Sequence, residues 1–238
     1  MSSGQVTPLI SSDASEARAQ MVEHQLRRRG SFDERVLEAM ARVPRERFVP
    51  TELRHLAYED GALPIGGGQT ISQPFIVATI CELLELSGDE RVLDVGTGSG
   101  YQAAVLAELA AEVVTIERVP ELAEQARSAL AQVGYGEVEV LVGDGSLGVP
   151  ARAPFDGIAV AAAAPVVPPP LYDQLVEGGR VVVPRGGRWG QQLVLVERTK
   201  KGPLERASLP CRFVPLVGAE GFAGGSSSQS DRPTWRSL

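Results

Sequence analysis

The chain has 238 residues, which is long enough for one α/β domain with a buried core and short for two. Hydrophobic residues make up 43 % and charged residues 22 %, as in ordinary globular proteins. The formal net charge of −7 disfavours nonspecific binding to nucleic acid, which depends on Lys and Arg neutralising phosphates. We therefore expect no nucleic-acid partner, and the basic run at residues 27–29 is typical of a solvated helix end.

Metal sites and membrane segments are also disfavoured. Cys81 and Cys211 match no zinc spacing, and His24 and His55 stand far apart, so no metal is expected. The N-terminal residues are polar and lack the apolar stretch of a secretory signal. No apolar run approaches the roughly 20 residues that a membrane span needs. These features predict a soluble cytoplasmic protein with no membrane partner.

The N-terminal part of the chain is predicted to be helical. Residues 1–12 have the composition of a flexible lead-in. Apolar periodicity and breaker residues predict helices at residues 13–29, 32–42 and 72–86. Between the last two, Pro44, Pro50 and the glycines at residues 66–68 are expected to interrupt regular structure.

From residue 91 onward, strand and helix patterns alternate. Strands are predicted at residues 91–95, 112–117, 138–142, 157–161, 180–184, 193–197 and 209–216, and helices at residues 101–110, 121–132 and 169–176. Such alternation indicates a mainly parallel sheet with helices on both faces. We expect a single domain at residues 13–217, with a helical part at 13–90 and the sheet at 91–217. The Gly/Ser-rich tail, residues 218–238, is predicted to be flexible.

The most informative motif is LDVGTGSG at residues 93–100. A buried strand runs into the glycines Gly96, Gly98 and Gly100, and a helix follows. In a doubly wound sheet, nucleotide-like ligands bind at this place, at the carboxyl ends of the strands. Glycine lets the backbone approach a ligand closely, and the helix N-terminus offers unpaired N–H donors. The motif therefore predicts a cofactor-binding loop.

Acidic residues stand at the ends of three successive predicted strands. Asp94 comes two positions before the loop and is expected to orient it. Glu117 has the spacing of an acid that bonds both ribose hydroxyls of a nucleotide. Asp144, followed by Gly145, is placed to accept a hydrogen bond from an adenine amino group. The alternative for each acid is that it ends a strand and caps the next helix.

The glycine spacing separates two kinds of cofactor. A dinucleotide fingerprint reads GxGxxG, whereas this loop reads GxGxG, with Tyr101 where the last glycine would fall. An acid two positions before such a loop resembles the signature of methyltransferases that use S-adenosylmethionine (SAM). A nicotinamide-dependent dehydrogenase is disfavoured by this spacing and by the lack of a catalytic His or Tyr constellation.

Several further segments resemble one family, the protein-L-isoaspartate O-methyltransferases. The resemblance covers roughly residues 18–217. The most specific segments are QTISQP at residues 69–74 and RFVPL at residues 212–216. The others are VPRERFV (43–49), ALPI (62–65), PFDGI (154–158), AAAP (162–165) and LVEGGR (175–180). Phe75 departs from the family, whose members often carry Tyr or His there.

The resemblance implies a Rossmann-like SAM-dependent methyltransferase fold with an N-terminal helical extension. It implies methyl transfer to the free carboxylate of isoaspartyl residues in damaged proteins and peptides, with S-adenosylhomocysteine (SAH) as the second product and no metal. Repair would then proceed through a succinimide. A same-family enzyme acting on a dedicated peptide is the alternative, and a binding module that kept the fold is a more distant one. We expect a monomer.

The substrate site is expected around the QTISQP segment. The resemblance assigns the serine at position 72 an active-site role, and the hydroxyl of Ser72 is suited to donate to a carboxylate oxygen. The alternative is that Ser72 caps the helix that follows. Thr70 and Ile71 are expected to line the same pocket. Val214 either pairs its backbone with an extended substrate peptide or lies in an edge strand of the sheet.

Overall fold

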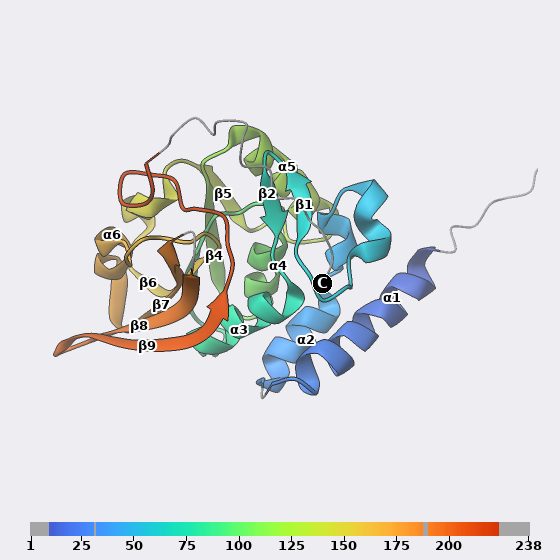
Figure 1. Cartoon of the computed structure of the whole chain (residues 1–238), viewed down its shortest axis with the longest axis horizontal. Coiled ribbons are helices and arrows are strands. Elements are labelled where there is room, and N and C mark those ends of the chain that lie inside the picture. The colour runs from blue at the N-terminus through green and yellow to red at the C-terminus, as the bar shows by residue number, and fades with distance from the viewer. Residues whose placement is uncertain (1–9, 31, 188–189, 224–238) are drawn as a thin grey trace, which may run out of the picture.

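A seven-stranded sheet forms the centre of the molecule, a computed structural model that describes residues 10–30, 32–187 and 190–223 (Figure 1). The strand order is β5-β4-β3-β6-β7-β8-β9. The strands from β5 to β7 are parallel, and β8 and β9 are antiparallel additions at one side. Their bounds are Arg91–Val95 (β3), Glu112–Glu117 (β4), Glu139–Val142 (β5), Phe155–Val160 (β6), Leu175–Gly187 (β7), Gly190–Thr199 (β8) and Gly202–Cys211 (β9).

Both faces of the sheet are covered, but unequally. Successive side chains of β3 point to opposite faces, so Val92 joins one core cluster and Leu93 the other. The first cluster packs against four helices: α2 (Glu34–Arg42), α3 (Pro74–Leu84), α4 (Tyr101–Ala107) and α5 (Pro120–Gln132). The second packs against the short α6 (Pro169–Asp173) and neighbouring loops. The predicted mainly parallel sheet with helices on both faces is confirmed.

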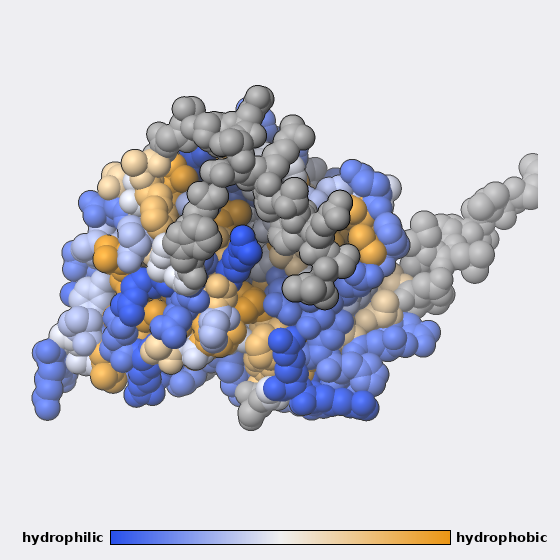
Figure 2. Space-filling model, viewed as in Figure 1, coloured by the Kyte–Doolittle hydropathy of each residue, from blue (hydrophilic) through white to orange (hydrophobic). Residues whose placement is uncertain are grey.

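The N-terminal helix begins earlier than the sequence predicts. Helix α1 (Ile10–Met21) continues as a wider π-helical stretch, Val22–Arg27, so residues 10–12 belong to the helix rather than to a lead-in. The rest of the predicted lead-in, residues 1–9, lies outside the described residues. The basic run pairs with acids at the surface: Arg27 with Glu34, Arg28 with Glu23, and Arg29 with Asp60. In Figure 2 this side of the molecule is mostly hydrophilic.

A second, two-stranded sheet was missed. Strands β1 (Leu63–Gly66) and β2 (Gln69–Ile71) form an antiparallel hairpin, and short 3₁₀ helices at Arg45–Phe48 and Thr51–Leu56 precede it. Gly66, Gly67 and Gly68 all have positive φ, which makes the tight turn possible. The sequence pattern failed here because glycines and Pro64 signal interruption rather than pairing. The hairpin is joined by two residues to α3 and carries the QTI sequence.

The C-terminal strand was predicted in the wrong place. Strand β9 ends at Cys211, whereas residues 209–216 had been expected to form the strand. Beyond β9, the side-chain amide of Gln191 donates to the carbonyl of Phe213 and accepts from its N–H, so these backbone groups do not pair with a strand. Pro215 has no N–H to donate to a neighbouring strand. Residues 212–217, which we call the closing segment, therefore leave the sheet edge and run back across the strand ends (Figure 1).

Residues 218–223 are also ordered, so the tail does not begin at residue 218. The N–H groups of Ala219 and Glu220 bond the side chains of Asp144 and Ser146, and Val217 bridges to Phe222. The remainder of the predicted tail, residues 224–238, lies outside the described residues.

Strands β7 and β8 are longer than expected because they form one long hairpin. The helix predicted at residues 169–176 ends at Asp173, and β7 begins at Leu175.

Among the helices that the structure describes, each is too short or too polar to span a bilayer.

Candidate active site

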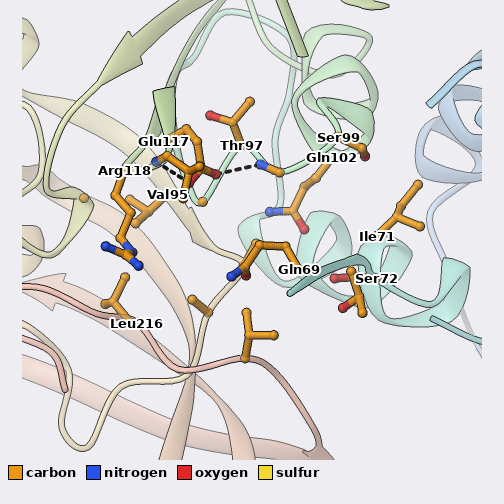
Figure 3. Close-up of a pocket in the computed structure, with 18 of the residues that line it drawn as sticks. Gln69, Ile71, Ser72, Val95, Thr97, Ser99, Gln102, Glu117, Arg118 and Leu216 are labelled. Atoms are coloured by element: carbon orange, nitrogen blue, oxygen red, sulfur yellow. Dashed lines mark hydrogen bonds between the residues drawn. The ribbon is translucent and has the colours of Figure 1, made fainter. Parts of the chain in front are cut away.

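One pocket opens at the carboxyl ends of β3, β4 and β6 (Figure 3). The glycine loop, the hairpin and the closing segment supply its walls, and its space, counted out to the open mouth, is about 900 Å³. The predicted site residues that line it are Thr70, Ile71, Ser72, Gly96, Gly98, Glu117, Gly145 and Val214. Segments far apart in the sequence therefore meet at the place where the sequence predicted a ligand.

The glycine loop turns sharply from β3 into α4. Gly96, Gly98 and Gly100 have φ values of 94°, 53° and 90°, which glycine adopts without a steric penalty. The N–H of Gly96 bonds the carbonyl of Ile116, which ties the loop to β4. Gly100 is not a pocket residue: it is the N-cap of α4, and a Cβ there would lie 3.2 Å from Leu130 Cγ.

Glu117 is fixed at the end of β4. Its side chain accepts hydrogen bonds from the N–H of Gly98 at 2.9 Å and from the N–H of Val119 at 3.0 Å. It is 6 % exposed and lines the pocket. Each carboxylate oxygen keeps acceptor capacity beyond these bonds. Glu117 therefore presents two oriented acceptors to a diol, as the prediction of ribose binding requires.

Asp144 lies beside the pocket and is occupied by its own neighbours. One carboxylate oxygen accepts from the N–H and the hydroxyl of Ser146, and the other accepts from the N–H of Ala219 at 2.8 Å. Partial burial works against its charge, but these hydrogen bonds hold the pKa of Asp144 below its usual range. The carboxylate caps a short 3₁₀ helix, which is the alternative weighed for each acid. Contact with adenine stays a prediction.

Gly145 follows Asp144 and does line the pocket. A Cβ at this position would lie 2.7 Å from Val95 Cγ1 and 3.3 Å from Ile116 Cγ2. A side chain here would clash with β3 and β4, so the packing of the pocket floor requires glycine at this position.

Asp94 lies beneath the pocket rather than in its wall. It is fully buried, and it accepts hydrogen bonds from Gln102 Nε2 at 2.7 Å and from Thr115 Oγ1 at 2.8 Å. Thr115 also bonds Thr97 of the glycine loop at 2.6 Å. Burial raises the pKa of Asp94 to about 6. Asp94 is therefore connected to the glycine loop by hydrogen bonds through Thr115 and Thr97, in agreement with its expected role of orienting the loop.

Ser72 stands at the junction between the hairpin and α3. The helix begins at Pro74, and its N-cap is Gln73, so Ser72 is not the capping residue. Its hydroxyl bonds no other described residue, which leaves it available to a ligand in the pocket. Ile71 is buried beside it, and Thr70 is exposed at the pocket rim.

Val214 reaches the pocket through the closing segment. Its carbonyl accepts a hydrogen bond from the N–H of Ala163 at 2.8 Å, and the N–H of Leu216 bonds the carbonyl of the same alanine. The edge-strand alternative is wrong, because the edge strand β9 ends at Cys211. Pairing with a substrate peptide stays a prediction.

The chain matches known proteins along most of its length. A family model described as protein-L-isoaspartate(D-aspartate) O-methyltransferase matches residues 16–221. The chain belongs to this family. It is 58 % identical over 212 residues to protein-L-isoaspartate O-methyltransferase 2 of Marinobacter nauticus, an alignment that covers 88 % of this chain and 97 % of the relative. It is 56 % identical over 210 residues to the Methanoculleus marisnigri enzyme, covering 87 % and 94 %.

Solved structures agree with the family at the level of the fold. A protein-L-isoaspartate O-methyltransferase superposes with a TM-score of 0.77 at 30 % identity, covering 86 % of this chain and 67 % of the other. A Plasmodium falciparum protein assigned to the same family, crystallised with SAH, superposes with a TM-score of 0.74 at 24 % identity, covering 84 % and 98 %. The methyltransferase fold is thus confirmed, and the dehydrogenase alternative is wrong.

The pocket is also lined by residues to which the sequence motifs assigned no role. These are Gln69, Val77, Val95, Thr97, Ser99, Tyr101, Gln102, Ile116, Arg118, Val119, Ala161, Ala162, Pro215, Leu216 and Val217. Most lie inside a recognised motif or within two residues of one, so their place at the pocket could have been expected. The orientation of Gln102 could not, because it depends on Asp94, which the fold brings beneath it. Among the described residues, no cluster of His, Cys, Asp and Glu could hold a metal ion.

Proposed function

We propose that this chain transfers the methyl group of SAM to the free carboxylate of L-isoaspartyl residues in damaged proteins and peptides. The observation that carries the proposal is that Ser72, which follows the hairpin, and Glu117, from β4, line one pocket. Glu117 is suited to bind the cofactor, and Ser72 is suited to bind the acceptor carboxylate. Transfer of a methyl group requires that the cofactor and the acceptor be held in the same cavity.

The residues present fit the cofactor. Glu117 supplies acceptors for a ribose diol, the glycine loop allows close approach of the backbone, and Gly145 lines the same pocket, where adenine is proposed to bind. When bound, SAM supplies a methyl group that its sulfonium charge has already activated. Residues around it therefore have to bind and align rather than activate.

Ser72 orients the acceptor carboxylate. A carboxylate with an ordinary pKa near 4 is ionised at pH 7, so no general base is needed to make it a nucleophile. The Ser72 hydroxyl donates to one carboxylate oxygen and leaves the other free to attack the methyl carbon. The apolar walls, which include Ile71, Val214 and Leu216, exclude water from the reacting atoms. Alignment of this kind can contribute roughly 7–11 kcal/mol.

The product ester explains why methylation alone starts repair. The methoxy group of the ester leaves more readily than the oxygen of the free carboxylate. The neighbouring backbone nitrogen can therefore attack the ester carbonyl and close a succinimide ring with loss of methanol. Hydrolysis of that ring returns part of the material as normal aspartate. The chain's own residues are needed only for the methyl transfer.

Two synthetic peptides test the proposal. They have the same sequence and differ only in an isoaspartyl or a normal aspartyl linkage, and each is incubated with the protein and methyl-labelled SAM. We expect label in the isoaspartyl peptide alone. Label in neither peptide, or equal label in both, would contradict the proposal. The dedicated-peptide alternative predicts activity on one flanking sequence only, so several flanking sequences are compared.

The remaining expectations belong to the same proposal. We propose that residues 13–217 act as one domain, together with residues 10–12 of α1 and residues 218–223, because the hairpin and the sheet both line the pocket. We also propose a monomer that acts in the cytoplasm, without nucleic-acid or membrane partners. Size-exclusion chromatography with light scattering tests the oligomeric state.

A further inference from the structure

One buried acceptor in the pocket wall has no partner. Gln102 lies in the first turn of α4 and is 7 % exposed. Its Nε2 donates to Asp94 Oδ1 at 2.7 Å, whereas its Oε1 has no hydrogen-bond partner among the described residues. Leaving a buried polar atom unsatisfied costs roughly 1–3 kcal/mol. A donor is therefore expected from the pocket side.

Asp94 determines which way the Gln102 amide faces. An ionised carboxylate only accepts hydrogen bonds, so the amide nitrogen must turn toward Asp94 and the amide oxygen away from it. The other carboxylate oxygen is held by Thr115 at 2.8 Å. With both oxygens of Asp94 engaged by donors, the amide cannot rotate without losing a hydrogen bond. Its oxygen is thus a preset acceptor.

The acceptor lies between the two halves of the site. In Figure 3 the Gln102 side chain reaches from α4 into the space between Glu117 and Ser72. The cofactor of the proposed function carries three kinds of donor: the adenine amino group, the ribose hydroxyls and the α-ammonium of its amino-acid moiety. In the proposed function Glu117 takes the ribose, and adenine is predicted to lie near Gly145. The ammonium is the donor left for Gln102.

Resting on the proposed function, we infer that Oε1 of Gln102 accepts a hydrogen bond from the α-ammonium group of the cofactor's amino-acid moiety, and that Asp94 positions it to do so. The negative charge of Asp94 behind the amide favours a cation on the other side. Gln102 is then a binding residue, and Asp94 is a positioning residue that acts through it.

A double-mutant cycle tests the contact. Gln102→Met keeps the length of the side chain and removes the acceptor. Binding of SAH and of its deaminated analogue, in which hydrogen replaces the amino group, is measured by isothermal titration at pH 7 for both proteins. Hydrogen bonds to charged groups predict that the substitution weakens SAH about 10-fold to 100-fold and leaves the deaminated analogue within about two-fold. Equal effects on both ligands, or none on either, overturn the inference.

Two further variants guard against a merely structural effect. Gln125→Met, at an exposed position of α5, is the matched control and should bind both ligands as the wild type does. In Asp94→Asn, the new amide can donate to Gln102, so the Gln102 amide can turn and present its nitrogen to the pocket. That variant should lose SAH affinity while keeping its affinity for the deaminated analogue, and a parallel loss of both contradicts the positioning role.

The inference and the proposed function fail in different ways. If the wild-type protein binds SAH and the cycle shows no coupling, the inference is wrong and the proposed function stands. If the coupling is found but isoaspartyl peptides are not methylated, the proposed function is wrong and the inference stands. If the wild-type protein does not bind SAH, both are wrong.

Discussion

The two sides of the pocket are built differently. On one side, the glycine loop and Glu117 follow strands β3 and β4, and β3 is paired along its length with neighbours on both sides. On the other side, Ser72 follows a hairpin that forms a separate two-stranded sheet, and the closing segment is held by bonds to Ala163 and Gln191. The cofactor side is thus fixed by the core, and the substrate side is attached to it at a few points.

This difference suits the two ligands. A single cofactor needs acceptors and close backbone in one fixed geometry, and rigid strand ends provide it. Damaged peptides differ in sequence around the isoaspartyl residue, and a lightly attached wall can adjust to them. This contrast between the two sides is testable. Substitutions on the cofactor side should change SAH affinity or the stability of the core, and substitutions on the substrate side should change kcat or the KM for the peptide.

The largest effect is expected from Asp94, on the cofactor side. In the folded protein its pKa is about 6, whereas an unfolded Asp has a pKa near 3.9. Between these values the folded state binds more protons, so its stability falls as the pH rises. The unfolding free energy of Asp94→Asn minus that of the wild type should therefore increase by about 2 kcal/mol from pH 4 to pH 6.5.

Urea denaturation of both proteins across this pH range measures the difference. Taking the difference cancels the contributions of other carboxyl groups, such as Glu90, whose pKa is lowered to about 2 chiefly by bonds from Ser87 and Gly88 that outweigh burial. A difference that does not change with pH would mean that Asp94 is not desolvated, and the contrast between the two sides would lose its basis.

The next effect is expected at Ser72, on the substrate side. Ser72→Ala should lower kcat at least about ten-fold, or about 1.4 kcal/mol, because it removes the donor to the acceptor carboxylate. The affinity for SAH should stay within about two-fold. Steady-state kinetics with an isoaspartyl peptide and titration with SAH measure the two quantities. Ser128→Ala, on α5, is the control, and an unchanged kcat in Ser72→Ala would remove Ser72 from the mechanism.

The smallest effect is expected at the hairpin turn. Gly67 has a φ of 56° and no close neighbour but Leu122, so Gly67→Ala costs about 1 kcal/mol of backbone strain without a clash. Because the hairpin carries the substrate residues, KM for the peptide should rise while the affinity for SAH stays unchanged. Gly61→Ala, where a Cβ meets nothing and φ is ordinary, is the control. A loss of SAH affinity in Gly67→Ala would show that the two sides are coupled.

The sequence predicted the cofactor side better than the substrate side, for a physical reason. Strands β3 and β4 lie at the residues expected, because short apolar runs bounded by a glycine turn leave few alternatives. The hairpin was missed because its glycines and Pro64 are local signals of interruption, while its pairing is with a strand only a few residues away. The closing segment was assigned to a strand because RFVPL is apolar, although Gln191 and Pro215 stop it from pairing as one.

Side-chain roles that depend on distant contacts were beyond the sequence. Asp144 was predicted to bind adenine from its place at a strand end, but Ala219 bonds one of its oxygens, and this contact joins residues 75 positions apart. Gln102 has no motif of its own and acquires its orientation only from Asp94. Motifs thus identified which strand ends matter, and the fold determines which atoms remain free there.

The closing segment has a consequence for synthesis of the chain. Val214 to Val217 line the pocket, although the glycine loop and the hairpin are translated more than a hundred residues earlier. A nascent chain can form β3, β4 and the hairpin before the ribosome has made this wall. Products that terminate after Cys211 would retain every strand of the sheet and lack one side of the cavity. The protein therefore acquires its complete site only after Val217 has been translated.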